Sequence, residues 1–301
     1  MAPLSAPVSV ALASCDRLPD LWDDDQVLAA ELRRRGLDLS SPAWDDLSVD
    51  WAGFDLVVIR NTWDYWHRRE EFVAWAHAVD AATTLLNPPD VVGWNTHKGY
   101  LRELATAGVP VVPTAWLAAG SHADVAGLIA ERGWVDVVVK PAVSAAADDT
   151  LRLRTAGVDD VQRLVDRVLP SRDVMIQPYV DAVDTTGERS LLYIAGELTH
   201  AVRRPPYLSA GIDADSTPAD AADDEIAVAE QVLDAVPGGR DRLLYARVDL
   251  IRDGDGAPML MEVELVEPQL FFRLSEPATQ RMATAIEALA GSAGRGTTSG
   301  S

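Results

Sequence analysis

Apolar runs alternate with helical patterns in the first part of the chain. Short apolar runs at Val8–Ala13, Asp55–Ile59 and Thr83–Leu86 predict three buried strands. Between them, apolar residues recur at helical spacing over Asp24–Arg35 and Arg69–Asp80, which predicts two helices. Strands that alternate with helices form parallel sheets with both faces covered, so we expect an α/β fold in this region.

The next part of the chain predicts one helix, a connector and a smaller mixed unit. The helix is expected over Asn95–Ala107, with Lys98 on it, and the Pro-rich segment Val109–Thr114 follows. Short strands and helices then alternate as far as residue 177. They are helix Ala123–Arg132, strand Val135–Lys140, strand Thr150–Arg154, helix Asp159–Leu169 and strand Val174–Gln177.

The last third of the chain is predicted to consist of strands closed by a helix. Strand patterns dominate from Leu191 onward, and a helix is expected over Pro277–Leu289. The tail Gly291–Ser301 is rich in Gly, Ser and Thr, so it is expected to be disordered.

Two apolar runs in this last third carry four charged residues between them. A turn rich in Asp and Gly joins Leu243–Ile251 to Met259–Leu265, which predicts a β-hairpin. Side chains alternate between the faces of a strand, so the charges should share one face. They are Arg247, Asp249, Glu262 and Glu264. Crowded carboxylates repel one another unless a cation lies among them, and their hard oxygen atoms suit Mg²⁺. The alternative is an ordinary solvated outer face.

Lys98 and Lys140 are the only lysines in a chain whose other basic residues are Arg. Lys140 ends an apolar strand, where an unpaired ammonium group is costly, so we expect an anion beside it. The segment Ala142–Ala147 after it consists mostly of small residues, whose backbone N–H groups can approach phosphate closely. A compact ammonium charge suits a phosphate oxygen. The alternatives are a surface lysine at 98 and a snorkelling lysine at 140.

Composition narrows the class of protein. The 301 residues are 48% hydrophobic, enough for a sizeable core and for two or three subdomains. A net charge of -21 makes nucleic acid and anionic membranes poor partners. The single cysteine, Cys15, excludes an intrachain disulfide, and no apolar run reaches bilayer length, so we expect a cytoplasmic protein. The pattern exposes no obvious subunit interface, so a homo-oligomer stays open.

The order of these elements from Asn87 to Leu270 resembles the ATP-grasp superfamily. The matching segments are Asn87-Pro88 with Lys98, Gly108–Thr114, Val137–Pro141, Ile176–Val180, Gly187–Leu198, Arg203-Arg204 and the acidic hairpin. Within the superfamily the chain looks like the glutathione-synthetase-like branch. The cluster Arg60–Tyr65 and the ending Glu262–Pro268 look most like the actinobacterial cyclo-ligases that form cycloserine.

The resemblance implies an ATP-grasp fold of mixed α/β (α+β) class. A Rossmann-like parallel-sheet domain would occupy residues 1–112, a lid subdomain 113–180, a C-terminal antiparallel-sheet domain 181–290 and a disordered tail 291–301. The lid would be hinged near Val112–Thr114 and Gln177–Val180 and would exclude water from the site.

The resemblance also implies a role for each matching residue. Two Mg²⁺ ions would be bound by Asp249, Glu262 and Glu264. ATP would be held by Lys98, Lys140, Ser144, Gln177, Tyr179, Val180 and Met261. Catalysis would use Arg247, Arg204 and Lys140, which steady phosphate and the developing acyl phosphate. The substrate would contact Arg60, Asn61, Thr62, Asp64, Glu188 and Arg203. The chain departs from the family in its Ser/Ala-rich loop after Lys140 and in Glu264, where relatives commonly have Asn.

The activity implied is that of an ATP-dependent carboxylate–amine ligase with an acyl-phosphate intermediate and a small amino-acid-like substrate. The most specific expectation is the intramolecular cyclisation of O-ureido-D-serine to D-cycloserine, with release of ADP and phosphate, in antibiotic biosynthesis. Two alternatives remain at this point: an intermolecular ligase that joins two amino acids, and a nucleotide-binding module without catalysis.

Overall fold

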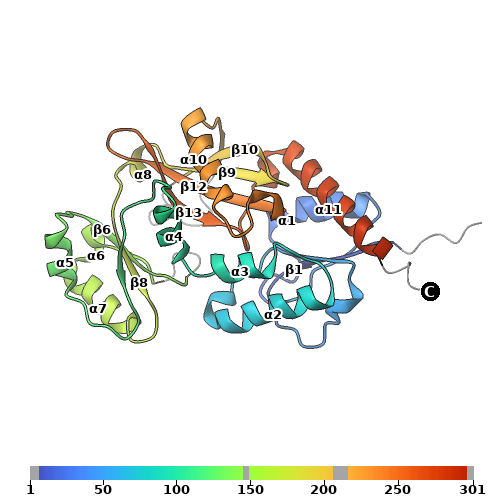
Figure 1. Ribbon diagram of the computed structural model, residues 1–301, viewed down its shortest axis with the longest axis horizontal. Coiled ribbons are helices and arrows are strands. Elements are labelled where there is room, and N and C mark those ends of the chain that lie inside the picture. Colours follow the sequence, from blue (N-terminus) through green and yellow to red (C-terminus); the bar gives the residue numbers. More distant parts are fainter. Residues whose placement is uncertain (1–6, 145–148, 206–215, 297–301) are drawn as a thin grey trace, which may run out of the picture.

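Three β-sheets form the framework of the molecule (Figure 1). The computed structural model describes residues 7–144, 149–205 and 216–296. The N-terminal sheet has the strand order β2-β1-β3-β4 and is parallel throughout. The central sheet, β5-β8-β6-β7, and the C-terminal sheet, β11-β10-β9-β12-β13, are antiparallel. The expected mixed α/β architecture is therefore confirmed.

The strands of the described residues are short in the first two sheets and longer in the third. Their bounds are β1 (Ser9–Ala13), β2 (Asp38–Ser40), β3 (Leu56–Ile59), β4 (Leu85–Leu86), β5 (Ala115–Leu117), β6 (Val137–Pro141), β7 (Leu151–Arg152), β8 (Val174–Pro178), β9 (Glu188–Ile194), β10 (Glu197–Arg204), β11 (Thr217–Ala219), β12 (Tyr245–Arg252) and β13 (Pro258–Glu264). The boundaries predicted after residues 112 and 180 fall between sheets, and they stay predictions.

Helices pack on the sheets and connect them. The α-helices are α1 (Asp23–Arg34), α2 (Arg69–Ala82), α3 (Pro89–Asn95), α4 (Tyr100–Thr106), α5 (Val125–Glu131), α6 (Leu153–Ala156), α7 (Val158–Val168), α8 (Ala182–Thr185), α10 (Asp223–Asp234) and α11 (Glu276–Gly296). Single 3₁₀ turns are η1 (Trp51–Gly53), η2 (Tyr65–Arg68), η3 (Arg240–Arg242) and η4 (Phe272–Leu274). Among the described residues, no helix has the length and apolar character needed to cross a membrane.

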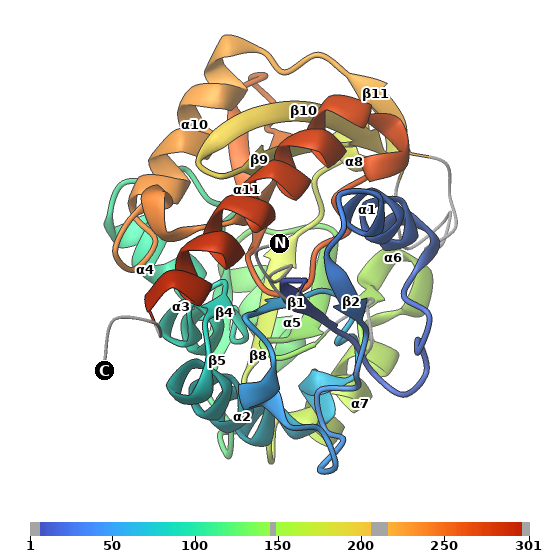
Figure 2. The ribbon, with the colours of Figure 1, turned by 90° about the vertical axis from the view of Figure 1, so that its right-hand side faces the viewer.

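Both faces of the N-terminal sheet are buried, which explains why its inner strands are apolar without interruption. Val10 and Leu12 of β1 pack in one core cluster with α1 and α11, whereas Ala11 and Ala13 pack in another with α2. Figure 2 shows α1 and α11 side by side on one face of this sheet and α2 on the other. The edge strand β2 was not predicted, because Asp38–Ser40 is mostly polar and pairs with β1 alone.

The helix predicted over Asn95–Ala107 is in fact two helices. α3 ends at Asn95 and α4 begins at Tyr100, so Lys98 lies in the turn between them and not on a helix. Tertiary contacts hold this turn. The backbone N–H of Lys98 donates to the carbonyl oxygen of Ala142 at 2.8 Å, and that of Gly99 donates to Nδ1 of His97 at 3.0 Å. Helical periodicity alone cannot register such a break.

Two further expectations need correction. The strand predicted over Thr150–Arg154 is shorter, because the backbone N–H of Arg154 donates to the carboxylate of Asp136 and α6 begins at Leu153. The tail expected to be disordered starts as helix, since α11 continues to Gly296 and buries Ala290 completely. Residues 297–301 lie outside the described part of the chain.

The C-terminal hairpin is held against the N-terminal domain by asparagine side chains. Nδ2 of Asn87 donates to the carbonyl oxygens of Tyr245 (2.9 Å) and Leu265 (2.7 Å), and Oδ1 accepts from the backbone N–H of Leu244 at 2.8 Å. The side chain of Asn95 likewise donates to one backbone carbonyl oxygen and accepts from one backbone N–H group at the end of β13. These hydrogen bonds pair buried backbone groups that the strand pairing leaves without a partner. They fix the hairpin in one position relative to the N-terminal sheet.

Replacing Asn87 by Ala should lower the free energy of unfolding by about 3 kcal/mol, since three buried backbone groups would lose their partners. Urea unfolding followed by circular dichroism measures this. Gln26→Ala is the control, because that exposed amide also donates to two carbonyl oxygens, and its removal should leave stability unchanged. If the two variants were equally stable, the hydrogen bonds of Asn87 would not hold the hairpin in place.

Candidate active site

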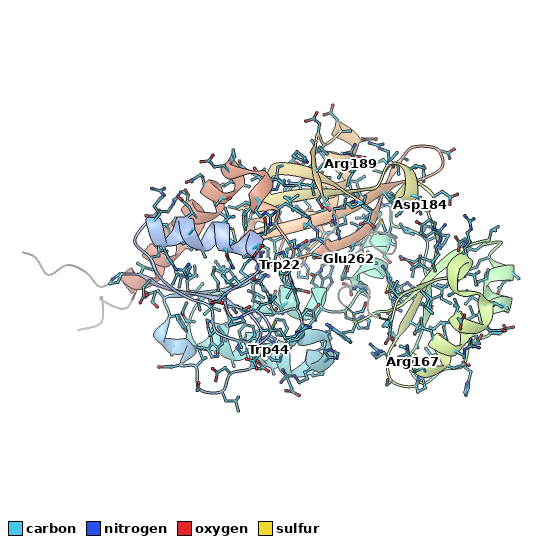
Figure 3. All side chains as sticks on the ribbon, turned by 180° about the vertical axis from the view of Figure 1, so that it is seen from behind. Trp22, Trp44, Arg167, Asp184, Arg189 and Glu262 are labelled. Carbon is cyan, nitrogen blue, oxygen red and sulfur yellow. The ribbon has the colours of Figure 1, made fainter. Side chains whose placement is uncertain are left out.

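A cavity of about 810 Å³ lies between the three sheets, and it is lined by strands of the central and C-terminal sheets and by segments that follow strands of the N-terminal sheet. Lys140 is contributed by the central sheet, Asp249 and Glu262 by the C-terminal sheet, and Trp63 by the loop after β3. Figure 3 shows Trp22 and Glu262 near the middle of the molecule, and both line this cavity. Its volume is in the range of pockets that bind nucleotides and small substrates.

The register of the hairpin brings its four charges to the cavity, as predicted. Arg247 pairs with Glu264 across β12 and β13, and Asp249 pairs with Glu262. Leu250 then pairs with Leu260, so Met261 is the extra residue of a β-bulge. The bulge lets Met261 line the cavity beside the charged residues.

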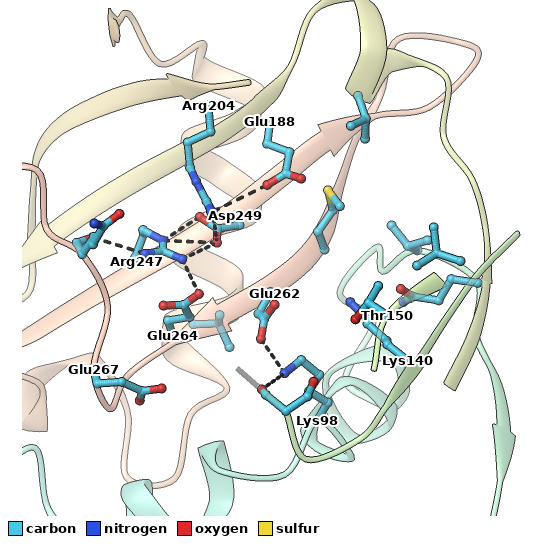
Figure 4. A pocket seen from close by; sticks show the side chains of 18 of the residues that line it. Lys98, Lys140, Thr150, Glu188, Arg204, Arg247, Asp249, Glu262, Glu264 and Glu267 are labelled. Carbon is cyan, nitrogen blue, oxygen red and sulfur yellow. Dashed lines mark hydrogen bonds and ion pairs between the residues drawn. The ribbon is translucent and has the colours of Figure 1, made fainter. Parts of the chain in front are cut away.

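Arg247 is the centre of an ion-pair network on this face (Figure 4). Its guanidinium group bonds Asp249 at 3.0 Å, forms an ion pair with Glu264 and donates to the carbonyl oxygen of Gln269. Arg204 bonds the same Asp249 at 3.0 Å and lies 3.5 Å from Glu188. Although burial would raise it, Arg247 and Arg204 keep the pKa of Asp249 below its usual range.

Lys98 connects the C-terminal sheet to the loop after Lys140. Its Nζ lies 3.0 Å from Glu262 and donates to the carbonyl oxygen of Ser144 at 2.9 Å. Burial opposes ionisation of Glu262, but Lys98 and Lys140 hold its pKa below the usual value. Residues Ala145, Ala146 and Ala147 of the predicted phosphate loop lie outside the described residues.

Lys140 has a charge without a partner. Val138 and Lys140 of β6 face the cavity, while Val137 and Val139 face the core of the central unit. The ammonium group of Lys140 makes no hydrogen bond or ion pair with the described residues. Burial lowers its pKa, and the positive charge of Lys98 adds to this, against the opposing charge of Glu262. An anion bound here would restore a normal pKa.

Carboxylates outnumber basic groups around the hairpin. Burial, together with Asp249 and Glu262, raises the pKa of Glu264 to about 7 in spite of Arg247. Burial and the charge of Glu264 raise the pKa of Glu267 to about 8. Such pKa values mark a surplus of negative charge, which a bound cation would relieve.

The three predicted metal ligands line one cavity but do not converge on a point. Within the described part of the chain, no three acidic, His or Cys side chains are grouped closely enough to hold a metal ion. Asp249, Glu262 and Glu264 each bond a basic side chain instead. The donor chemistry fits Mg²⁺, since all three supply carboxylate oxygens on neighbouring strands, and ligation itself stays a prediction.

The segment after β8 forms the predicted adenine end of the cavity. Gln177 donates from Nε2 to Oγ1 of Thr114 at 2.9 Å. The backbone N–H of Tyr179 is already bonded to the carbonyl oxygen of Asp136, whereas that of Val180 has no partner among the described residues. Val180 is therefore the residue here that can donate a backbone hydrogen bond to a ligand.

Four residues predicted to contact substrate do not line the cavity. Arg60 is fully buried, with Nε bonded to Asp25 at 2.6 Å and Nη2 donating to the carbonyl oxygen of Pro268 at 2.7 Å. Asn61 bonds the same Asp25 at 2.8 Å and accepts from the backbone of Trp22. These side chains support the cavity wall from behind.

The other two of these four also belong to the framework. Thr62 is completely buried, and Asp64 accepts a hydrogen bond from Nε1 of Trp44 at 2.8 Å. Their neighbours Trp63 and Tyr65 line the cavity instead. The predicted cluster thus lies at the cavity, but the side chains that line it are Trp63 and Tyr65 and not the four assigned to the substrate.

Arg203 also lies away from the cavity. It is exposed, and its guanidinium group donates to the carbonyl oxygens of Thr185 and Thr186. Arg204 lines the cavity, since adjacent residues of a strand point to opposite faces. Glu188 lines it as predicted.

Several lining residues were not predicted as site residues, among them Trp22, Trp63, Tyr65, Glu267 and Gln269. One feature of the sequence could have identified Trp22, Trp63 and Tyr65 in advance. In parallel sheets ligands bind beyond the carboxyl ends of the strands, and these aromatic residues follow β1 and β3.

Comparison with known proteins identifies the class. Residues 10–87 match the family model described as the N-terminal domain of D-cycloserine synthetase DcsG. The cycloserine biosynthesis protein DcsG of Streptomyces lavendulae is 36% identical over 286 residues, which cover 89% of this chain and 94% of that protein.

Solved structures agree. The crystal structure of D-cycloserine synthetase DcsG has a TM-score of 0.81 at 32% identity, covering 93% of this chain and 99% of that one. The ATP-grasp ligase PsnB, in complex with a minimal precursor, Mg and ADP, has a TM-score of 0.61 at 19% identity, covering 94% and 98%. The chain is an ATP-grasp ligase, an enzyme class that uses ATP and Mg²⁺ to form carbon–nitrogen bonds. It belongs to the D-cycloserine synthetase family.

Replacing Arg60 by Met should lower the free energy of unfolding by about 3–5 kcal/mol, because Asp25 would be left buried without its ion pair. Urea unfolding measures the loss. Arg163→Met is the matched control, since Arg163 is a surface partner of Asp160 and should not affect stability measurably. A stable Arg60→Met enzyme with a raised KM for the amino-acid substrate alone would restore the substrate role.

Proposed function

We propose that this ligase closes the ring of O-ureido-D-serine to give D-cycloserine, as a step in antibiotic biosynthesis. The observation that carries the proposal is the 36% identity to a cycloserine biosynthesis protein along nearly the whole length of both chains. The cytoplasm is the proposed compartment, which the single cysteine supports because a structural disulfide is absent by composition.

The proposed reaction balances with one ATP and one water. The substrate carboxylate attacks the γ-phosphorus of ATP, ADP leaves and an acyl phosphate forms. The nitrogen bonded to the side-chain oxygen attacks the acyl carbon, loses its proton and displaces phosphate, which closes the ring. Water then cleaves the carbamoyl group from that nitrogen as carbon dioxide and ammonia. Because nucleophile and electrophile belong to one molecule, intramolecularity supplies much of the effective concentration.

Basic side chains on two walls of the cavity support the phosphoryl transfer. Lys140, which has no partner in the part of the chain that the structure describes, is suited to a phosphate oxygen of ATP, and Lys98 lies on the adjoining wall. Arg247 and Arg204 face the same space from the C-terminal sheet and would stabilise charge that develops on the acyl phosphate. Val180 would donate its backbone N–H to the adenine.

Asp249, Glu262 and Glu264 would hold Mg²⁺, and three carboxylates on one wall of the cavity are compatible with two ions. Bound Mg²⁺ neutralises charge on the phosphates. The central sheet would act as a lid, and its contacts with Lys98 through Ser144 would help exclude water from the acyl phosphate.

The structure disfavours an intermolecular ligase with a second amino acid. Arg60, Arg203 and Arg204 were the candidates for a second substrate carboxylate. Arg60 is buried against Asp25 and Arg203 is exposed elsewhere, so of these three only Arg204 faces the cavity, where it is assigned to the acyl phosphate.

The direct test is to incubate the enzyme with O-ureido-D-serine, ATP and Mg²⁺. Equal amounts of ADP, phosphate, ammonia and D-cycloserine are expected, with D-cycloserine identified by mass spectrometry. Chelation of Mg²⁺ should abolish all four. ATP turnover that requires a second amino acid, with no cyclic product, would refute the cyclisation.

Glu264→Asn should retain kcat within about tenfold, because the amide oxygen of Asn is still a hard ligand and the crowded carboxylates lose one charge. Asp249→Asn should lower kcat by more than about 100-fold, since this change also removes the ion pairs with Arg247 and Arg204. Both are measured as kcat and as the Mg²⁺ concentration for half-maximal rate. A loss in Glu264→Asn as large as that in Asp249→Asn, with folding intact, would mean that Glu264 has a second role.

A further inference from the structure

Glu267 differs from the other carboxylates of the cavity. Glu188, Asp249, Glu262 and Glu264 each have a basic partner. The carboxyl group of Glu267 makes no hydrogen bond or ion pair with the described residues, although it lines the cavity. Figure 4 shows it pointing into the open space, apart from the network around Arg247.

The backbone of Glu267 is held in place by an aromatic wall. Nε1 of Trp63 donates to the carbonyl oxygen of Glu267 at 3.0 Å, and the rings of Trp63 and Trp22 lie 5.5 Å apart between centroids. Both indoles line the same cavity. A carboxylate beside indole rings is the chemistry that recognises an ammonium group, through an ion pair and cation–π attraction.

Charge around Glu267 favours a cation as its partner. Burial first, and then the charge of Glu264, raise the pKa of its carboxyl group to about 8. A bound ammonium group would supply the positive charge that ionises this carboxyl group at neutral pH.

The position of Glu267 suits the shape of an α-amino acid. The basic side chains Lys98, Lys140, Arg204 and Arg247 lie on the walls where the substrate carboxylate must meet ATP. Glu267 lies on the wall toward the N-terminal domain, next to Trp63. An α-amino acid carries its ammonium group on the carbon next to its carboxylate, so both groups can be bound at once.

We propose that Glu267, with Trp22 and Trp63 beside it, binds the α-ammonium group of the substrate. The inference rests on the proposed function and deepens it. Anchoring this group directs the carboxylate toward the phosphates and leaves the ureido arm free to fold back on the acyl carbon. It also makes the site select substrates that carry a free amino group.

The test compares O-ureido-D-serine with 3-(carbamoylaminooxy)propanoic acid, which lacks the amino group. The wild-type enzyme should prefer the amino substrate by about 100-fold or more in kcat/KM. Glu267→Gln should lower kcat/KM for the amino substrate by about 30-fold or more, mainly through KM, and leave that for the analogue unchanged. The KM for ATP and the Mg²⁺ dependence should not change.

Two variants serve as controls. Glu267→Asp keeps the charge and should recover part of the lost affinity. Glu131→Gln removes a carboxylate from the exposed end of α5, away from the cavity, and should have wild-type kinetics. Thermal unfolding should show Glu267→Gln to be at least as stable as wild type, because an unpaired carboxyl group is removed.

The outcomes separate the two proposals. If wild type converts O-ureido-D-serine but Glu267→Gln has unchanged kinetics, or loses activity equally on both substrates, the ammonium site is refuted and the proposed function stands. If Mg²⁺ dependence shifts instead of KM, Glu267 acts on the metal and the inference fails. If wild type does not convert O-ureido-D-serine, the proposed function fails and the inference falls with it.

Discussion

Arg247 joins Asp249 and Glu264 on one face of the β12–β13 hairpin, and the rest of the site depends on this pairing. Without a basic group between them, the buried carboxylate of Asp249 and the partly buried one of Glu264 on the adjacent strand would repel each other and oppose the register that brings them together. With Arg247 between them, the hairpin can carry several acidic side chains on a face that would otherwise be apolar. In the proposed function, the same arginine would turn to a phosphate when Mg²⁺ is bound by the carboxylates.

Such a hairpin must also be held in one position relative to the other two sheets. Asn87 and Asn95 do this from the N-terminal side through buried backbone groups of the hairpin. From the central side, Lys98 bonds both Glu262 and the loop after Lys140. The cavity therefore has polar walls from three parts of the chain, and each wall is held by its own hydrogen bonds.

Two ionisable groups of the cavity that lack a partner among the described residues indicate which ligand groups it binds. A lysine and a carboxylic acid without a partner among the described residues destabilise the empty fold, and proteins keep such groups mainly where a ligand pairs with them. Lys140 offers a cation and Glu267 an anion, on different walls. In the proposed function, phosphate would bind at the lysine and the amino group of the substrate at the carboxyl group. The intramolecular ligation proposed here requires this combination.

Sequence patterns determined the local features: the strands of the first sheet, the hairpin and the shared face of its four charges, because period and turn chemistry act over a few residues. The order of its elements also indicated the ATP-grasp class. Tertiary structure alone decided the rest. A hydrogen bond to Ala142 interrupts the predicted helix at Lys98. An ion pair with the buried carboxylate of Asp25 holds Arg60 away from the cavity. Because side chains alternate along a strand, Arg204 lines the cavity and Arg203 does not. That Glu267 lacks a partner among residues 7–144, 149–205 and 216–296 became visible only in the folded structure, since pairing depends on contacts between residues far apart in the chain.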